Sequence, residues 1–502
     1  MFLRRSLTCW LILALLCLLF LASPLFLRTA EPGTDEPGLA KALALVSGER
    51  MLADVRRLSS EEFNGRQTGT ADDFRSGLMV AERFQSLGLQ LTQFMSARLG
   101  VQGWAMPEPV TVTQIADQAL LQLYVGLDSL VAQLGTDYLP ILDSPSVNVI
   151  APVVFVGYGI SDPARGFDEY EGLDVRNRIV LFLRGKPDWY PDPVATADKE
   201  RTAREKGAVA FLLVTGPIVP AYEARRGFGT APMGSYSGVG GERPLPGAWI
   251  TPALAERLFA QPPRSLREAQ EHLNRTRTPR SGSTGVHARL LWESRQAPGT
   301  LYNFLAVKPG ADPRLAPETI VIGAHRDHFG RQGGVLFPGA DDNASGTAVL
   351  LEVARVLAGV PLKRSVLFIS FSGEEQGLLG SRFYINRLPR SLSQTLAMIN
   401  VDHAGVGNGK LTVGVTGLHK EAAMEAGRRA DLADRIEVFG FFPGGDHVPF
   451  KEAGIPTVTV VSGGAHPHFH QPTDTAETVK PDILEAAARY VLALSWQLAN
   501  AP

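Results

Sequence analysis

The sequence predicts an α/β protein with a mixed, mainly parallel sheet covered by helices on both faces, and a β-rich domain inserted into it. After residue 300, short β-branched runs alternate with helical patterns, which is typical of parallel strands joined by helices. From about residue 130 to 285, apolar runs are instead bounded by Gly, Pro and Asp, which favours strands and turns. The chain has 502 residues, 45% of them hydrophobic, which is enough for more than one domain.

The first 36 residues predict an export leader with its linker. Arg4 and Arg5 precede a charge-free stretch, residues 6–27, which as a helix would span ~33 Å and could cross a bilayer. The two arginines favour a cytoplasmic N-terminus, so the rest of the chain is expected on the periplasmic, extracellular or lumenal side. The available cleavage sites are poor, and a cleaved signal peptide and an uncleaved membrane anchor both stay open.

The next two segments are predicted to be the N-terminal part of the main domain, residues 37–130, and the inserted domain, residues 131–285. In the first segment, apolar residues recur at helical spacing through Phe74 and Phe84, and the turn-rich loop 63–70 comes before them. A Ser- and Gly-rich stretch, residues 280–285, is interpreted as a linker at the end of the insertion. Strands are expected in the insertion at residues 153–156, 179–183 and 210–214.

Residues 286–502 are predicted to complete the main domain. Because parallel strands end at the same edge of a sheet, the side chains that follow them are expected to form one site. The expected strands are residues 319–323, 365–372, 397–401 and 457–461, and the expected helices are residues 347–358, 378–388, 418–433 and 481–498.

The composition excludes several kinds of chemistry. Lys and Arg total 49 against 51 for Asp and Glu, so the basic excess of a nucleic-acid-binding protein is missing. The two cysteines, Cys9 and Cys17, both lie in the leader. Beyond it a disulfide scaffold, a cysteine nucleophile and a Cys-ligated metal are therefore excluded, and any metal must be held by His, Asp and Glu.

Such side chains do follow the predicted strands. Eight of the ten histidines lie after residue 300. Imidazole mixed with carboxylate suits Zn²⁺, with Mn²⁺ or Co²⁺ as substitutes. Each motif alone has a structural explanation, such as a helix N-cap for Asp-Asp-Asn, but their shared position at strand ends favours a common site. The motifs are Gly-Ala-His-Arg-Asp-His at 323–328, Ala-Asp-Asp-Asn at 340–343, Gly-Glu-Glu at 373–375, Asp-His at 402–403 and His-Pro-His-Phe-His at 466–470.

The set HRDH, PGADDNASG, SGEEQGLLGS, INVD, GGDHVPF and HFHQPTDT resembles the co-catalytic di-zinc aminopeptidase family over residues 300–480. The resemblance implies a zinc aminopeptidase-like fold. The VVFVGYGI stretch and residues 172–185 look like the protease-associated domain that many members carry as an insertion. The loop at residues 65–70 is similar to an N-terminal segment of those members.

The resemblance also implies roles for individual residues. Glu374 is expected to be the general base, and Asp327 to orient His325 from behind. Asp474 is expected to support the loop that carries the last ligand. Two zinc ions are implied, with Asp342 bridging them because two close cations need a shared anion. The implied metal ligands are His325 and Asp402 for one ion, His470 and Glu375 for the other, and Asp342 for both.

These features predict an exported di-zinc metallo-exopeptidase, an aminopeptidase that hydrolyses N-terminal peptide bonds of peptide substrates by a metal-activated hydroxide. A carboxypeptidase or dipeptidase on the same metal centre, and a non-catalytic receptor-like binding module, are the alternatives. Oligomeric state and the preferred N-terminal residue stay open. His403 and His468 depart from the family pattern and are interpreted as hydrogen-bonding neighbours, with contact to substrate or metal as the second interpretation.

Overall fold

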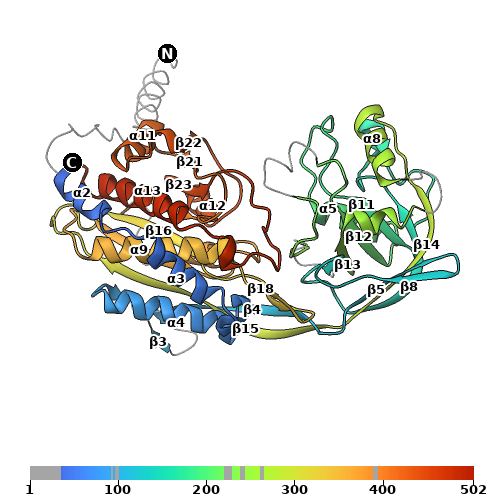
Figure 1. Ribbon diagram of the computed structural model, residues 1–502, viewed down its shortest axis with the longest axis horizontal. Coiled ribbons are helices and arrows are strands. Elements are labelled where there is room, and N and C mark those ends of the chain that lie inside the picture. Colours follow the sequence, from blue (N-terminus) through green and yellow to red (C-terminus); the bar gives the residue numbers. More distant parts are fainter. Residues whose placement is uncertain are drawn as a thin grey trace, which may run out of the picture.

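The computed structural model describes residues 36–91, 94–96, 101–103, 105–219, 229–237, 244–259, 265–387 and 394–502 (Figure 1). The predicted leader, including residues 6–27, lies outside the described residues. Among the helices that are described, none is both long and apolar enough to cross a membrane. Two sheets lie side by side in Figure 1, one in each half of the molecule.

The larger sheet has nine strands, and the polar motifs singled out by sequence follow its central strands. Strands β19, β16, β20 and β23 run parallel to one another in that order, and β15, β1, β4 and β21 add antiparallel neighbours. These central strands are buried along their length except at Leu396 of β20, as expected for a sheet covered on both faces. The strands are β1 (Gln90–Leu91), β4 (Ala105–Ile115), β15 (Ser294–Lys308), β16 (Thr319–His325), β19 (Ser365–Phe371), β20 (Thr395–Val401), β21 (Leu411–Thr416), β22 (Ile436–Phe439) and β23 (Thr457–Ser462).

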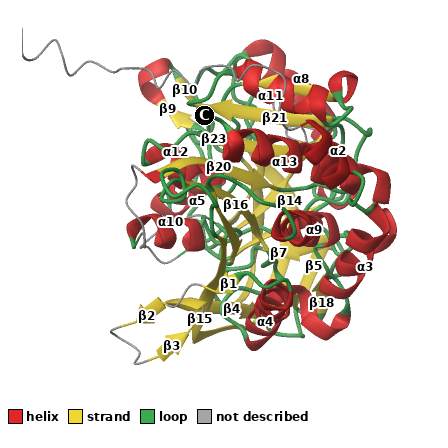
Figure 2. Ribbon diagram, turned by 90° about the vertical axis from the view of Figure 1, so that its left-hand side faces the viewer, coloured by secondary structure: helices red, strands yellow, loops and turns green. Residues whose placement is uncertain are grey.

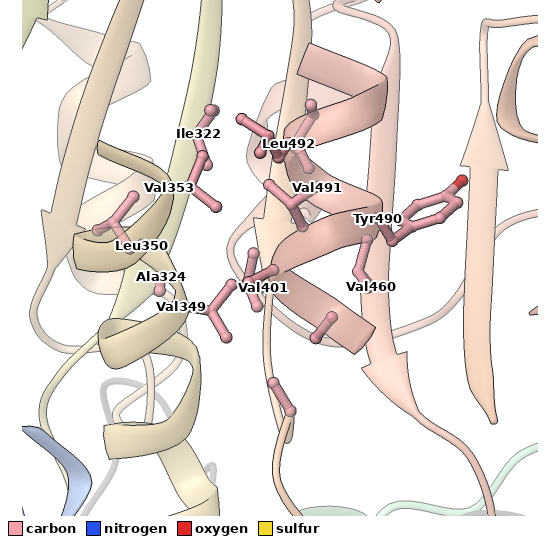
Figure 3. Packing of buried hydrophobic residues seen from close by; sticks show 14 of the residues in the cluster. Ile322, Ala324, Val349, Leu350, Val353, Val401, Val460, Tyr490, Val491 and Leu492 are labelled. Carbon is pink, nitrogen blue, oxygen red and sulfur yellow. The ribbon is translucent and has the colours of Figure 1, made fainter. Parts of the chain in front are cut away.

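Helices cover both faces of this sheet (Figure 2). On one face α3, α4, α9 and α13 pack against alternate side chains of the central strands, and on the other α10 and α12 do so. Figure 3 shows Val349 and Val353 of α9 and Val491 of α13 pointing into this apolar core. The helices are α2 (Glu36–Leu43), α3 (Gly48–Leu58), α4 (Ala71–Ser86), α9 (Gly346–Ala358), α10 (Leu379–Asn386), α11 (Lys420–Arg429), α12 (His447–Glu452) and α13 (Pro481–Asn500).

The second sheet has eight strands in the order β6-β5-β14-β8-β11-β12-β13-β7. Its core strands β8, β11, β12 and β13 are parallel, and α5 (Thr196–Glu205), α7 (Pro252–Glu256) and α8 (Leu266–Thr276) belong to the same part of the chain. Its strands are β5 (Leu120–Val125), β6 (Asp128–Val131), β7 (Tyr138–Pro140), β8 (Val147–Phe155), β11 (Ile179–Leu183), β12 (Ala210–Val214), β13 (Gly247–Ile250) and β14 (Gly282–Trp292). Two-stranded sheets pair β2 (Phe94–Ser96) with β3 (Val101–Gly103), β9 (Ser161–Asp162) with β10 (Phe167–Asp168), and β17 (Gly330–Gln332) with β18 (Val335–Phe337).

A long antiparallel pair joins the two sheets. Ser294–Phe304 of β15 pair with residues Ala105–Ile115 of β4, and β14 ends at Trp292, so one ribbon leads from the second sheet into the first (Figure 1).

The predicted fold class, a mainly parallel sheet with helices on both faces, is confirmed, and the expected central strands start where predicted or within two residues of it. One prediction is wrong. Residues 280–285 are not a linker, because β14 begins at Gly282 and its small residues sit in a bulged stretch paired with β8. The second sheet takes strands from Leu120 to Trp292, which is wider at both ends than the predicted segment 131–285.

Candidate metal centre

The polar side chains singled out by sequence converge at one edge of the larger sheet. His325 ends β16, Glu374 and Glu375 follow β19 by a short turn, and Asp402 follows β20 directly. The loop after β23 brings in His470, and the irregular turn 340–345 before α9 brings in Asp342. These parallel strands end together, so their loops meet beyond the carboxyl edge, as the topology rule requires.

Three of the predicted ligands form the first half of the centre. His325 Nε2 lies 3.4 Å from Asp342 Oδ1 and 3.3 Å from Asp402 Oδ1. Ligand atoms about 2.1 Å from a tetrahedral zinc ion lie about 3.4 Å from one another. His325 and Asp342 are almost fully buried, and the two distances from His325 Nε2 are those expected for atoms that bind one zinc ion.

The other oxygen of Asp342 faces the second half. His470 Nε2 lies 2.9 Å from Asp342 Oδ2 and 3.3 Å from Glu375 Oε2. Asp342 therefore presents one carboxylate oxygen to each group of side chains, which is the arrangement that a bridging ligand needs. All five predicted metal ligands are thus brought together, and this donor set of imidazole and carboxylate suits zinc.

Glu374 lies beside the first half, since it forms a group with His325 and Asp402 whose ligand atoms all fall within 4.8 Å of one another. Burial raises the pKa of Glu374 well above its usual value, although His325 opposes the shift. Burial and the neighbouring carboxylate of Asp342 raise the pKa of Glu375 in the same direction. So many buried acids repel one another, and divalent cations between them would offset that repulsion.

Two opposing effects act on the pKa of His325. Burial by itself would lower the pKa of His325, but the carboxylates of Asp402 and Glu374 outweigh it and hold that pKa well above the usual value. A buried imidazole surrounded by carboxylates is typical of a cation site.

Asp327 lies behind the ligands rather than among them. Its Oδ1 is 3.6 Å from His325 Nδ1, and its backbone oxygen is 3.2 Å from the same nitrogen. The carboxylate also accepts hydrogen bonds from Thr68 Oγ1 (2.8 Å) and from the backbone N–H groups of Glu374 and Glu375 (3.3 and 3.4 Å). Asp327 therefore connects the loop after β16 with the loop after β19.

Asp474 holds the turn that carries Asp342. Its carboxylate accepts hydrogen bonds from the backbone N–H groups of Asp341 (2.9 Å) and Asp342 (3.0 Å). Burial, with Asp341 as the next cause, raises the pKa of Asp474 to about 8.

Two buried side chains beside the centre, His328 and Arg66, received no role from the sequence. His328 is fully buried, and its Nδ1 lies 2.7 Å from Glu375 Oε1. Arg66 is also fully buried and donates to the carbonyls of Arg326 (2.6 Å) and Gly339 (2.7 Å) on either side of the centre. The alternation of His325, Arg326, Asp327 and His328 beyond a strand could have indicated His328, whereas a loop arginine 260 positions from its partner left no local signal.

The second sheet's part of the chain also reaches the centre. The carbonyl of Gly234 lies 3.1 Å from His470 Nδ1, and the Gly234 N–H donates to the His470 carbonyl (2.8 Å). Gln376, just after the two glutamates, donates to the hydroxyl of Tyr236 (3.3 Å). The segment 229–237 thus holds one predicted metal ligand from behind, which no sequence motif revealed.

The two histidines that depart from the family pattern, His403 and His468, have different neighbours in the structure. His468 Nδ1 lies 2.9 Å from Thr473 Oγ1 within its own loop. His403 Nε2 lies 3.7 Å from both Asp342 Oδ2 and Asp402 Oδ1, so this ring belongs to the centre.

Comparisons with known proteins agree with this geometry. Residues 303–495 match the sequence model described as peptidase family M28. Aminopeptidase YwaD of Bacillus subtilis (strain 168) is 34% identical over 192 residues, 36% of this chain and 41% of the relative. A probable leucine aminopeptidase of Arthroderma otae is 29% identical over 211 residues, 39% of this chain and 57% of the relative. The chain therefore spans about half the length of these curated relatives.

Solved structures match over most of the chain. An aminopeptidase from Aneurinibacillus sp. strain AM-1 superposes with a TM-score of 0.65 at 22% identity, covering 92% of this chain and 97% of that one. A zinc aminopeptidase from Bacillus subtilis gives 0.61 at 22% identity, covering 91% and 96%. At this identity the likeness establishes a shared fold that includes both sheets. Residues 303–495, which hold the strands from β16 to β23 and the polar edge they form, are thus similar to peptidase family M28.

Proposed function

We propose that the chain is an exported metallo-exopeptidase with two zinc ions, an aminopeptidase that releases residues from the N-termini of peptides. One observation carries the proposal: Asp342 presents its two oxygens to two ligand groups, His325 with Asp402 and His470 with Glu375. A carboxylate shared in this way is the central requirement of a two-metal hydrolase. The relatives' names, aminopeptidase and probable leucine aminopeptidase, support the same activity.

In this proposal Glu374 is the general base. It lies beside His325 and Asp402 without being needed as a ligand, so its carboxylate can take the proton of the attacking water and return it to the leaving amine. When bound, two divalent ions supply Lewis acidity, which polarises the scissile carbonyl and makes water acidic enough to react near neutral pH. Asp327 positions His325 and the backbone of Glu374, and so fixes the distance between base and ligands.

The second sheet is proposed to be a protease-associated domain that completes the centre. Its parallel strands β8, β11, β12 and β13 are inserted between β4 and β15 of the peptidase sheet. Its segment 229–237 contacts His470 and Gln376, which supports a role in shaping the space beside the second ligand group. Export is proposed from the sequence of the leader, in which residues 6–27 serve either as a cleaved signal peptide or as an uncleaved membrane anchor.

The test is a panel of chromogenic substrates offered to the purified full chain with Zn²⁺. The panel contains aminoacyl p-nitroanilides, the same compounds with an acetylated amine, and peptides with a free or amidated carboxyl end. We expect hydrolysis of the free-amine compounds, with leucine among the accepted residues, and loss of hydrolysis when the amine is acetylated.

Other outcomes identify the alternatives. Cleavage that requires a free C-terminal carboxylate and tolerates a blocked amine would make the chain a carboxypeptidase. Absence of all hydrolysis, in protein shown to contain two zinc ions, would favour the non-catalytic binding module.

A further inference from the structure

His403 occupies an unusual backbone position at the metal centre. It follows Asp402 at the end of β20 with φ of 45°, a left-handed conformation that L side chains rarely adopt. The backbone on both sides is held by hydrogen bonds: the N–H of Ser462 donates to the His403 carbonyl (2.8 Å), and the N–H of Ala404 donates to Ser345 Oγ (2.8 Å). Strained conformations that the surroundings enforce are concentrated at functional sites.

The strained backbone directs the ring into the centre. His403 Nε2 lies 3.7 Å from Asp402 Oδ1 and 3.7 Å from Asp342 Oδ2. Both distances exceed a hydrogen bond, but the distance to Asp402 Oδ1 is close to the spacing of atoms that bind one ion. The same Asp402 oxygen lies 3.3 Å from His325 Nε2, whereas Asp342 Oδ2 is the oxygen that faces His470. His403 therefore faces the two carboxylates without donating to either of them.

The other ring nitrogen faces a carboxylate that is itself fixed. His403 Nδ1 lies 3.6 Å from Asp341 Oδ2, just beyond hydrogen-bond distance. Asp341 is held in place by the N–H of Gly405 (2.8 Å) and by His466, whose Nδ1 lies 2.6 Å from Asp341 Oδ2. A carboxylate behind an imidazole is the usual way in which a metal-binding histidine is oriented, with the other nitrogen left to the metal.

Packing fixes the plane of the ring. The His403 ring centroid lies 5.0 Å from that of Phe469 and 5.3 Å from that of His466, and the side chain is 17% exposed. An imidazole restrained on both sides loses little freedom when it binds an ion.

We propose that His403 is a sixth protein ligand of this metal centre, whose Nε2 binds the ion held by His325 and Asp402. The inference rests on the proposed function for the presence of the two ions. His403 gives that ion a second imidazole next to the carboxylates, and Asp341 acts as the positioning residue for it. The ion beside His325 and Asp402 should therefore bind more tightly than it would without His403.

The test measures metal binding rather than turnover. The full chain, the variants His403→Ala, His403→Gln and Asp341→Asn, and the control His468→Gln are freed of metal and titrated with Zn²⁺ in competition with a chromogenic chelator. The Co²⁺-loaded proteins are compared by their visible absorption, which reports the ligands of the ion. His468 serves as the control because it is the other histidine that departs from the family pattern, and its Nδ1 lies 2.9 Å from Thr473 Oγ1 in the loop that carries His470.

We expect both His403 variants to lose about tenfold or more in affinity at one of the two sites, and Asp341→Asn to lose affinity at the same site. The Co²⁺ spectrum should change in both His403 variants and stay unchanged in His468→Gln. The proposal is overturned if wild-type chain binds two ions and both His403 variants keep its affinities and its spectrum. A wild-type chain that binds no Zn²⁺ would instead contradict the proposed function. Thermal unfolding of the metal-free proteins checks that each variant is folded, and Asp341→Asn tests the same site without altering the strained residue.

Discussion

Two adjacent glutamates at the end of β19 occupy different environments, although both are acids with raised pKa values. Glu375 is engaged twice, with His328 Nδ1 at 2.7 Å and His470 Nε2 at 3.3 Å, as a ligand would be. Glu374 lies on the side of His325 and Asp402, away from the contacts that Glu375 makes. The sequence Glu-Glu alone assigns neither role, because both residues are equally acidic and adjacent.

The first prediction separates the two glutamates. Glu374→Gln should keep both zinc ions and lose about 10²- to 10⁴-fold in kcat, because an amide cannot take the water's proton. Glu375→Gln should lose zinc itself. Metal analysis and hydrolysis of a leucine p-nitroanilide measure both effects, and near-wild-type turnover in Glu374→Gln would refute its role as base.

A second prediction concerns a buried acid far from the centre. Glu169 is fully buried, and its carboxylate accepts hydrogen bonds from the backbone N–H groups of Tyr158 and Ile160 (both 2.9 Å). Burial raises the pKa of Glu169 from 4.5 to about 8, so the folded state binds this proton more tightly than the unfolded state. Its contribution to stability is therefore complete below about pH 4.5 and is lost as the pH rises through about 8.

The free energy of unfolding, measured by urea titration at several pH values, checks this sign. Between about pH 5 and about pH 9 wild type should lose more stability than Glu169→Gln, whose amide does not titrate. Glu171→Gln, at an exposed neighbouring position, should follow wild type. A wild-type protein whose stability relative to Glu169→Gln rises with pH would show that the carboxylate is charged in the fold.

At the scale of elements, the turn at residues 61–70 is hydrogen-bonded to the loops that form the candidate metal centre. Arg66 is buried and donates to four carbonyls, those of Leu58, Arg326, Pro338 and Gly339. Burial lowers the pKa of Arg66 to about 10, which still leaves it charged at neutral pH. One side chain thus satisfies the backbone of two loops that carry predicted metal ligands.

The third prediction follows from these hydrogen bonds of Arg66. Arg66→Met should lower the free energy of unfolding by about 3–5 kcal/mol, because it leaves buried carbonyls without donors. Arg75→Met, which removes a half-exposed arginine paired with Asp72, should change it by less than about 1 kcal/mol. Equal losses in the two variants, measured by denaturant unfolding, would show that Arg66 contributes no more than a surface pair.

The sequence was sufficient for the elements that carry the chemistry. Parallel strands are short apolar β-branched runs, and the predicted run 319–323 lies within β16, just as 397–401 lies within β20. Their position in a parallel sheet was enough to expect the ligands at one edge. Spacing of motifs could not reveal the contacts of Arg66, Gly234 or His403, since these depend on long-range packing and on a strained φ that no local pattern encodes. The small residues at 280–285 misled because a bulged strand and a linker favour the same residue types.

At the scale of the molecule, both sheets contribute to one centre. The loops of the larger sheet supply the five predicted ligands. The segment 229–237, which belongs to the second sheet's part of the chain, places the Gly234 carbonyl 3.1 Å from His470 Nδ1. The β4–β15 ribbon connects the two units along its length (Figure 1). Substitutions in the second unit should therefore alter metal binding.

The fourth prediction tests this coupling with two glycines. A Cβ at Gly234 would lie 2.7 Å from Phe329 Cδ2, so Gly234→Ala should displace the carbonyl that orients His470 and weaken zinc at that site by about tenfold. Gly229→Ala should have no such effect, because nothing lies within 4 Å of its Cβ. Zinc titration of the two variants measures the difference. Identical affinities would show that the second sheet's part of the chain does not influence metal binding.

The central claim, that two ions at this polar edge make the chain a peptidase, is tested most directly by removing them. Wild-type chain is dialysed against a chelator, and leucine p-nitroanilide hydrolysis is measured as Zn²⁺ is added back. We expect hydrolysis to disappear on chelation and to return fully at about two equivalents of zinc per chain. Hydrolysis that survives complete removal of metal would contradict the account.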